Sequence, residues 1–403
     1  MASPSRFCRL RRIVLALLSV FVVLKGAHWV MWFVHTRQEI AVLQRMGFGR
    51  DCAMCDDDGY VWALSLDDTD SVSDEVLGCL RELAHLRRLH ITGRGFTDQG
   101  LASLTGLTRL EEVYLRVPSD AIWARQEILT DEGLSYLRGL ESLRRLRYVG
   151  GSVTDAGMRH LEGLHNLEDL AVSCREATDD GLKSLAKLDR LESLTLLNGP
   201  GMTGEGLVAL PDPSRLRELL LKNVTDGGMR TIARFRNLRD LSIAGPRLGV
   251  DGLKDLLVFS DLEKLTIAGA SVDNRVLETV VGKITGLKEL TIYDCPIRGD
   301  ALKHLHRLKE LEVLSVCGAG LDDASAPYLE EFPKLRHLWL ERTSITSASL
   351  PHLLRVRTLE EVFVPFSIRM TPERRRELRE ALPRLRELWT ADGMVEFGVR
   401  KEK

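Results

Sequence analysis

The stretch VTDAGMRHLEGLHNLEDLAV, residues 153–172, can be laid almost letter for letter over LTDEGLSYLRGLESLRRLRY, residues 129–148. Both belong to a long series, because the pattern L-x-x-[LV]-x-[LIV] recurs along most of the chain. Copies follow one another at intervals of 22–26 residues, except for one interval of 33 residues between Leu110 and Leu143. A looser copy, VWALSL, begins at Val61. The other copies begin at Leu86, Leu110, Leu143, Leu167, Leu191, Leu216, Leu238, Leu262, Leu287, Leu311, Leu335, Leu359 and Leu385.

Each copy changes its hydrophobic period from that of a strand to that of a helix. In LEDLAV, Leu170 and Val172 alternate with polar or small residues, which is the period of a strand with one buried face. A T-D-x-G-[LM] motif follows; its threonine is a good helix N-cap, and the acid after it favours a helix N-terminus. Its last residue begins an apolar stripe with helical spacing. The motif begins at Thr97, Thr130, Thr154 and Thr178, with variants at Thr203 and Thr225.

A glycine recurs three residues after each of these threonines. Because glycine has no Cβ, our hypothesis is that adjacent coils approach too closely there for any larger residue. The six positions are Gly100, Gly133, Gly157, Gly181, Gly206 and Gly228.

A single strand with its short helix cannot bury its leucines, and stacking of the copies solves this problem. Stacked strands form one parallel sheet, and the helices form the opposite wall. Thirteen strands spaced at about 4.8 Å give a sheet that extends roughly 58 Å along the stack. The sequence therefore predicts an α/β solenoid over residues 61–390, with about 13–14 repeats.

The motif L-x-x-L-x-L followed by T-D-x-G-L resembles leucine-rich repeat proteins, specifically the helix-containing bacterial and F-box-associated types. The resemblance covers about residues 61–390. It implies a horseshoe with a concave parallel sheet and a helical convex wall. In such proteins the concave face binds a protein or peptide, and catalytic activity is rare. The asparagine ladder of the family is weak here, because glycine, asparagine or cysteine stands in its place.

The N-terminal region differs from the repeats. Residues 13–34, IVLALLSVFVVLKGAHWVMWFV, are long and apolar enough for a transmembrane signal-anchor helix. The alternative is a cleaved signal peptide whose apolar region is Ile13–Leu24. Residues 1–12 form a short basic flank, which predicts a cytoplasmic N-terminus and an extracytoplasmic location for residues 35–403.

Two further segments flank the repeats. Residues 35–60 are predicted to form a linker and an acidic N-terminal cap, and residues 391–403 a C-terminal tail. In the cap, Cys52 and Cys55 form a CxxC pair, for which a disulfide, a redox motif or half of a metal site are the alternatives. No second CxxC or suitable histidine pair accompanies them, so the sequence favours a cap disulfide and predicts no metal site.

Composition narrows the classes of function. The formal net charge is −2, so no global positive field attracts nucleic acid, and none is expected as a partner. The chain contains no G-x-x-x-x-G-K-[ST], G-x-S-x-G or H-E-x-x-H motif. We therefore expect no enzymatic activity and no cofactor.

The residues expected on the concave face indicate two candidate sites. Toward the C-terminus, the fifth letters of consecutive copies are Trp339, Phe363 and Trp389, with His337 and Glu341 alongside. Three large rings on neighbouring strands form an exposed apolar surface of the kind that marks partner sites, unless the C-terminal tail folds back over it.

Toward the N-terminus, the same positions are basic and aromatic. Tyr114, Arg145 and Arg147 lie on neighbouring predicted strands, and the long interval between copies adds a loop that carries Trp123. A basic patch beside an aromatic loop could hold an acidic partner segment. The alternative is a solvated charged face with a tolerated insertion.

The sequence therefore predicts a membrane-anchored leucine-rich repeat module that binds a protein or peptide on its concave face and is anchored through residues 13–34. One alternative is an intracellular adaptor that recruits substrates, as in F-box-associated repeats. The other is a structural cell-surface spacer without a specific ligand.

Overall fold

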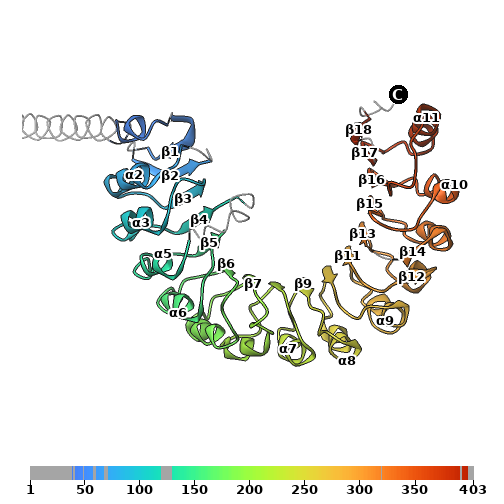
Figure 1. Ribbon diagram of the computed structural model, residues 1–403, viewed down its shortest axis with the longest axis horizontal. Helices are drawn as coiled ribbons and strands as arrows, with labels where there is room; N and C mark the ends of the chain where they lie inside the picture. Colours follow the sequence, from blue (N-terminus) through green and yellow to red (C-terminus); the bar gives the residue numbers. More distant parts are fainter. Residues whose placement is uncertain are drawn as a thin grey trace, which may run out of the picture.

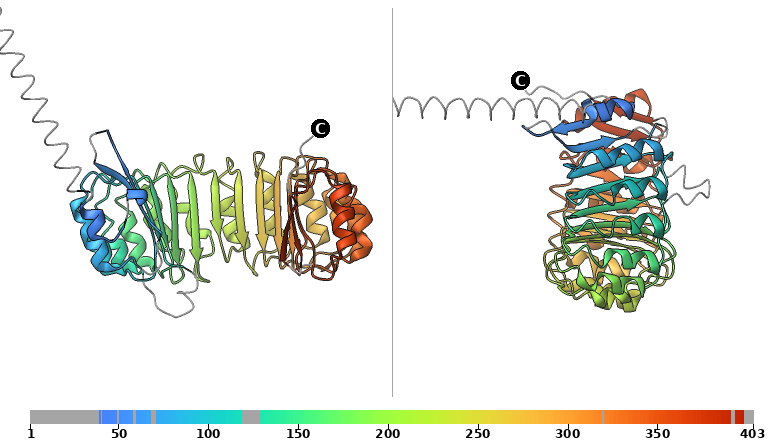
Figure 2. Two further views of the ribbon diagram at one scale, coloured as in Figure 1. Left: turned by 90° about the horizontal axis from the view of Figure 1, so that it is seen from above. Right: turned by 90° about the vertical axis from the view of Figure 1, so that its left-hand side faces the viewer.

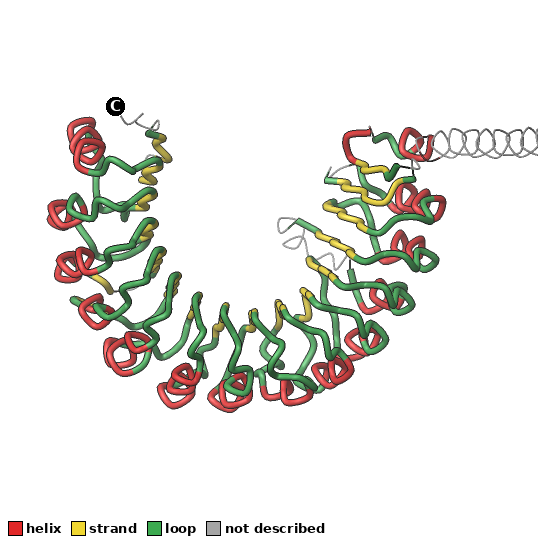
Figure 3. The backbone as a smooth tube through the Cα atoms, turned by 180° about the vertical axis from the view of Figure 1, so that it is seen from behind, coloured by secondary structure: helices red, strands yellow, loops and turns green. Residues whose placement is uncertain are grey.

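The computed structural model describes residues 39, 41–48, 50–57, 60–67, 71–118, 129–318, 320–390 and 393–397. In this part of the chain the coils stack into a horseshoe, with the strands on the inner face and the helices on the outer face (Figures 1 and 3). The two ends of the stack lie at the two arms of the horseshoe. The predicted solenoid, with a concave parallel sheet and a helical convex wall, is confirmed.

One sheet lines the whole concave face, and within the described residues it has sixteen strands (Figure 2). Its central strands are parallel and pair in phase, so that the same letter of the motif repeats from strand to strand, as in Leu146, Leu170 and Leu194. The parallel strands are β2 (Val61–Leu66), β3 (Arg88–Thr92), β4 (Glu112–Arg116), β5 (Arg145–Val149), β6 (Asp169–Cys174), β7 (Ser193–Asn198), β8 (Glu218–Leu221), β9 (Asp240–Ala244), β10 (Lys264–Ala268), β11 (Glu289–Tyr293), β13 (Val313–Cys317), β15 (His337–Trp339), β16 (Glu361–Phe363) and β17 (Glu387–Thr390).

An antiparallel strand ends the sheet on each side. β1 (Ala53–Cys55) pairs with β2, and β18 (Gly393–Glu396) pairs with β17. Because the edge of a sheet exposes unpaired backbone groups, these short strands cover both ends of the parallel stack. A separate pair, β12 (Arg298–Gly299) with β14 (Gly320–Leu321), lies outside this sheet.

The convex wall consists of short helical segments, because each repeat leaves room for only one or two turns. The α-helices are α2 (Asp74–Gly78), α3 (Asp98–Leu101), α5 (Asp131–Ser135), α6 (Asp155–Met158), α7 (Asp226–Ile232), α8 (Val250–Leu253), α9 (Asn274–Thr279), α10 (Leu350–Leu353) and α11 (Pro372–Ala381). The 3-10 segments are η1 (Arg50–Cys52), η2 (Cys79–Glu82), η3 (Ala102–Leu104), η4 (Arg159–Leu161), η5 (Gly181–Lys187), η6 (Glu205–Ala209), η7 (Lys254–Val258), η8 (Val281–Lys283), η9 (Ala301–Leu305), η10 (Asp323–Glu331) and η11 (Ser347–Ser349).

The core runs as one continuous cluster between the sheet and the wall. The first, fourth and sixth letters of each copy supply it; Leu167, Leu170 and Val172 of one copy are all fully buried. Burial of one such side chain stabilises the fold by about 1.5–3 kcal/mol. Tyr148, which departs from the motif, takes the same inward position and is also fully buried.

Threonine–aspartate pairs join coils in the N-terminal half of the stack and once more near its C-terminal end. Thr97, Thr130 and Thr154 are N-caps, as predicted, and each hydroxyl accepts a backbone N–H of its own helix. The same threonine donates its backbone N–H and its hydroxyl to the aspartate of the preceding coil. We call this row of acceptors the aspartate ladder; it consists of Asp74, Asp98, Asp131, Asp155, Asp179 and Asp323.

The close approach predicted at the motif glycines is confirmed. A Cβ added to Gly157 would lie 2.7 Å from Cγ of Asp131, a member of the aspartate ladder in the preceding coil. Gly133 faces Asp98 in the same way, and Gly206 faces the backbone at Asp179. The glycine is therefore required because the inter-coil acceptor occupies the space of a side chain.

The structure corrects the prediction of a transmembrane helix. Among the described residues, no helix has both the length and the apolar character needed to cross a membrane. The longest α-helix among them, α11, has 10 residues and spans about 15 Å, half of a bilayer's hydrocarbon core. The predicted segment, residues 13–34, lies outside the described residues. The single-pass membrane topology, the anchoring through this segment and the extracytoplasmic location deduced from it are therefore withdrawn.

Candidate functional site

Three aromatic side chains form a row on the concave face of the last parallel strands. Trp339 of β15, Phe363 of β16 and Trp389 of β17 are aligned by the strand register. Each follows a fully buried core residue, so the alternation of the strand directs the three rings away from the core. We call these three residues the aromatic ladder.

Two rings of the aromatic ladder pack against each other, and Phe363 also packs against a fourth ring. Phe363 and Trp389 are stacked, with centroids 6.4 Å apart and an interplanar angle of 9°. Phe366, in the turn after β16, lies 6.2 Å from Phe363. The exposed fractions of Trp389 and Phe366 are 38% and 60%. The surface is thus ordered before a ligand arrives and remains accessible to it.

The C-terminal segment extends this surface, and its described residues do not cover it. Residues 393–397 continue the sheet through β18, which places Met394 opposite Trp389. Met394 is 42% exposed. Phe397 is buried, and its backbone N–H donates to the carbonyl of Arg386. The predicted alternative, in which the tail folds over the rings, does not apply to these residues.

A second row, mostly of acids, runs beside the aromatic ladder. His337, Glu361, Glu387 and Glu396 pair in register on β15, β16, β17 and β18. His337 Nδ1 lies 3.0 Å from Glu361 Oε2. The indole Nε1–H of Trp389 donates to Glu387 Oε2 at 3.1 Å. We call Glu361, Glu387 and Glu396 the acidic row.

At the opposite end of the concave face, the predicted basic patch is largely neutralised. Tyr114 lies between His90 and Arg147 in the register of β3, β4 and β5. Arg145 donates to Glu112 at 2.7 Å, and His90 Nε2 lies 2.9 Å from the same carboxylate. Partial burial acts to raise the pKa of Glu112, but these hydrogen bonds outweigh it and lower the pKa.

Arg147 is paired in the same way, because it donates to Asp169 of β6 at 3.1 Å. Glu112 and Asp169 are thus counter-charges that the sequence reading did not assign to this patch. Both occupy the third letter of their copies, which begin at Leu110 and Leu167 on either side of the Leu143 copy, so the register of the repeat places both on the concave face. Trp123, predicted to join this site, lies outside the described residues.

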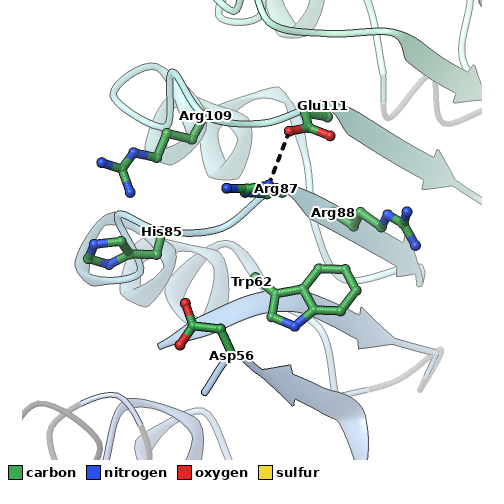
Figure 4. A pocket seen from close by; sticks show the side chains of 7 residues that line it. All are labelled: Asp56, Trp62, His85, Arg87, Arg88, Arg109 and Glu111. Carbon is green, nitrogen blue, oxygen red and sulfur yellow. Dashed lines mark ion pairs between the residues drawn. The ribbon is translucent and has the colours of Figure 1, made fainter. Parts of the chain in front are cut away.

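A pocket of about 350 Å³ opens beside this patch, at the start of the first parallel strands (Figure 4). The guanidinium of Arg88 lies 5.2 Å from the centroid of the Trp62 ring. Arg87 extends toward Glu111, 3.7 Å away. Asp56, His85 and Arg109 complete its lining. Mixed charges surround one aromatic ring, in contrast with the C-terminal end, where rings predominate.

The two cysteines of the N-terminal cap lie in different secondary-structure elements. Cys52 ends η1 and is half-buried, whereas Cys55 is exposed in β1. Burial raises the pKa of Cys52. The disulfide between them stays a prediction. Over the described ranges, no group of three histidine, cysteine, aspartate or glutamate residues is arranged to hold a metal ion.

The architecture resembles that of solved leucine-rich repeat proteins. An internalin from Listeria monocytogenes str. 4b F2365 matches with a TM-score of 0.51 and 17% identity, over 81% of this chain and 86% of the internalin. The LRR ectodomain of the Arabidopsis receptor kinase HAESA, in complex with an extended IDA peptide hormone, matches with a TM-score of 0.50 and 14% identity, over 88% and 69% of the two chains. No protein-family model matches the chain, and no curated protein matches its sequence. The similarity establishes a leucine-rich repeat fold.

Proposed function

We propose that this chain is a non-catalytic binding module of the T-D-x-G-L type, which holds a protein or peptide against the aromatic ladder. The observation that carries the proposal is the row of Trp339, Phe363 and Trp389 on the concave sheet, where Trp389 is exposed and the other two rings are half-buried. Monomeric proteins rarely expose contiguous apolar surface without a partner, and tryptophan is enriched among the residues that dominate binding energy.

Two further features support a binding role. The ladder is built on strands held in register by their neighbours, so a ligand does not have to order it, which reduces the entropic cost of binding. The fold also accommodates peptides, since the Arabidopsis ectodomain of similar architecture is described with a peptide hormone. Tyr114, Arg145 and Arg147 form a secondary contact surface in this proposal, as does Trp123.

Selection from a library of random peptides tests the proposal directly. The full chain is immobilised, and the enriched peptides are then titrated against a variant in which Trp339, Phe363 and Trp389 are all alanine. We expect affinity to fall by about 100-fold or more, because truncation of a central aromatic contact typically costs at least about 2 kcal/mol.

A matched control removes apolar side chains from the convex wall. Val208 of η6 and Leu257 of η7 are 62% and 47% exposed, and both are replaced by alanine. This double variant should bind the selected peptides like the wild type, and the thermal unfolding midpoints of all three proteins verify that they are folded. A selection that yields no binders, or only binders that the ladder variant retains, would contradict the proposed function.

A further inference from the structure

The charge around the aromatic ladder indicates the chemistry of its ligand. The strand register places each acid of the acidic row beside a ring or thioether: Glu361 by Phe363, Glu387 by Trp389 and Glu396 by Met394. Residues two apart in a strand are separated by about 6.6 Å, and neighbouring strands by about 4.8 Å. The carboxylates thus follow the apolar row along its length, within reach of a single long side chain lying on a ring.

Among the residues that the structure describes, the nearby cations are too few to neutralise the acidic row. His337 pairs with Glu361 alone. Arg336 and Arg386, which precede the same strands, are directed to the buried carboxylate of Glu360 at 2.8 Å and 3.7 Å. Within the described residues, the surface therefore combines partly exposed rings with three carboxylates and one imidazole, which is an environment for positive charge.

We propose that the ligand of the aromatic ladder is a basic, extended peptide whose lysine or arginine side chains lie over the rings and pair with the acidic row. This inference rests on the proposed function and specifies its partner. A cation above an aromatic face is attracted by the ring quadrupole, and the long stems of lysine and arginine cover apolar surface while their charged ends reach a carboxylate. An uncharged peptide would bury the acidic row without a partner, and an acidic peptide would be repelled by it.

The spacing of the rings predicts the spacing of the cations. Trp339 and Trp389 are two strands apart, which corresponds to about 10 Å across the sheet. A chain in the extended polyproline II conformation advances about 3.1 Å per residue and returns its side chains to the same face every three residues, so basic residues three positions apart reach the two ends of the ladder.

Fluorescence anisotropy with three labelled peptides of equal length tests the inference on the full chain. The peptides share their apolar and spacer residues and carry lysine, glutamine or glutamate at every third position. We expect the lysine peptide to bind about tenfold or more tightly than the glutamine peptide, and the glutamate peptide to bind most weakly. Added salt should weaken the lysine peptide selectively, because the pairing is at an exposed surface.

Variants separate the charge from the rings. In the triple variant Glu361→Gln, Glu387→Gln and Glu396→Gln, the lysine peptide should bind no better than the glutamine peptide. The control changes the net charge by the same amount elsewhere, by Glu377→Gln and Glu380→Gln on the exposed side of α11 and Asp189→Asn in a distant turn. This control should keep the lysine peptide within about twofold of the wild-type affinity.

The outcomes distinguish the inference from the function on which it rests. The lysine and glutamine peptides could bind the wild type equally well and both fail to bind the aromatic-ladder variant. This result would contradict the proposal of a basic ligand but would support the proposed binding function. Binding of the lysine peptide that survives in the ladder variant contradicts both proposals. A lysine peptide that does not bind, or that binds the acidic-row variant like the wild type, overturns the inference.

Discussion

Asp131 of one coil accepts two hydrogen bonds from Thr154 of the next coil, from the backbone N–H at 2.8 Å and from the hydroxyl at 2.5 Å. The same hydroxyl accepts the backbone N–H of Ala156 at 3.1 Å, within α6. Helix capping and coil stacking are therefore one hydrogen-bonded chain, and its repetition along the aspartate ladder holds the convex wall together.

Replacement of Asp131 by alanine should destabilise the solenoid by about 2–3 kcal/mol, because it leaves the half-buried N–H of Thr154 without its charged acceptor. The effect is measured by urea unfolding, in which the variant should unfold at a lower urea concentration than the wild type. The control is Asp189→Ala, in an exposed turn, which should change stability by no more than about 0.5 kcal/mol. Equal effects of the two substitutions would show that the ladder does not stabilise the fold.

Gly157→Ala should cost about 1–3 kcal/mol, because the added Cβ overlaps the carboxylate of Asp131. The control is Gly139→Ala, because a Cβ added to Gly139 has no atom within 4 Å. This substitution should leave the stability unchanged or increase it slightly. The double variant of Asp131→Ala and Gly157→Ala should lose less stability than the sum of the single variants, since the first removes the carboxylate that the added Cβ meets, although the contact with Val153 Cγ1 at 2.7 Å remains. If the losses of unfolding free energy of the two single variants add up to that of the double variant, this steric coupling is excluded.

The repeat could be predicted from the sequence because its leucines recur with a fixed interval and a period that changes at a fixed place. Tyr148 shows the limit of that reading. It departs from the motif, yet its ring fills the core position and its hydroxyl reaches Asp98, 50 residues earlier. The role of the motif aspartate could not be assigned within one copy, because its partner is in the next coil.

The candidate site, too, could be predicted only in part from the sequence. The register of the copies is enough to place Trp339, Phe363 and Trp389 on one face. Met394 and Glu396 were missed, because β18 pairs antiparallel and lies outside the repeat pattern. The repeat places Glu112 on the concave face, but its pairing with Arg145 depends on where the long side chains extend between strands, and a linear pattern does not contain that information.

Tyr148→Phe should cost about 1–2 kcal/mol at neutral pH, because the hydroxyl lies 2.9 Å from the carbonyl oxygen of Thr130 and 3.1 Å from Asp98 Oδ1. Burial, followed by the charge of Asp98, raises the pKa of Tyr148 far above its ordinary value. The neutral phenol is thus favoured by folding, so its contribution is complete below about pH 10 and is lost as the pH rises above this.

The stability gap between the wild type and Tyr148→Phe should therefore be constant up to about pH 9 and should narrow above about pH 10. Urea midpoints measured across this range test the sign. Tyr293→Phe, at a tyrosine that is 40% exposed on β11, serves as the control and should follow the wild type at each pH. A gap that widens with pH contradicts the buried neutral phenol.

Glu112→Gln should convert the N-terminal patch into an anion-binding surface. Glu112 holds Arg145 at 2.7 Å and His90 at 2.9 Å, and glutamine keeps the shape of the side chain but removes its charge. The released guanidinium should increase affinity for fluorescent polyglutamate by several-fold, about 1 kcal/mol, at low ionic strength. The neighbouring Glu111→Gln makes the same change in net charge at a residue 3.7 Å from Arg87. If both variants gain equal affinity, net charge and not the release of Arg145 controls binding at this end of the horseshoe.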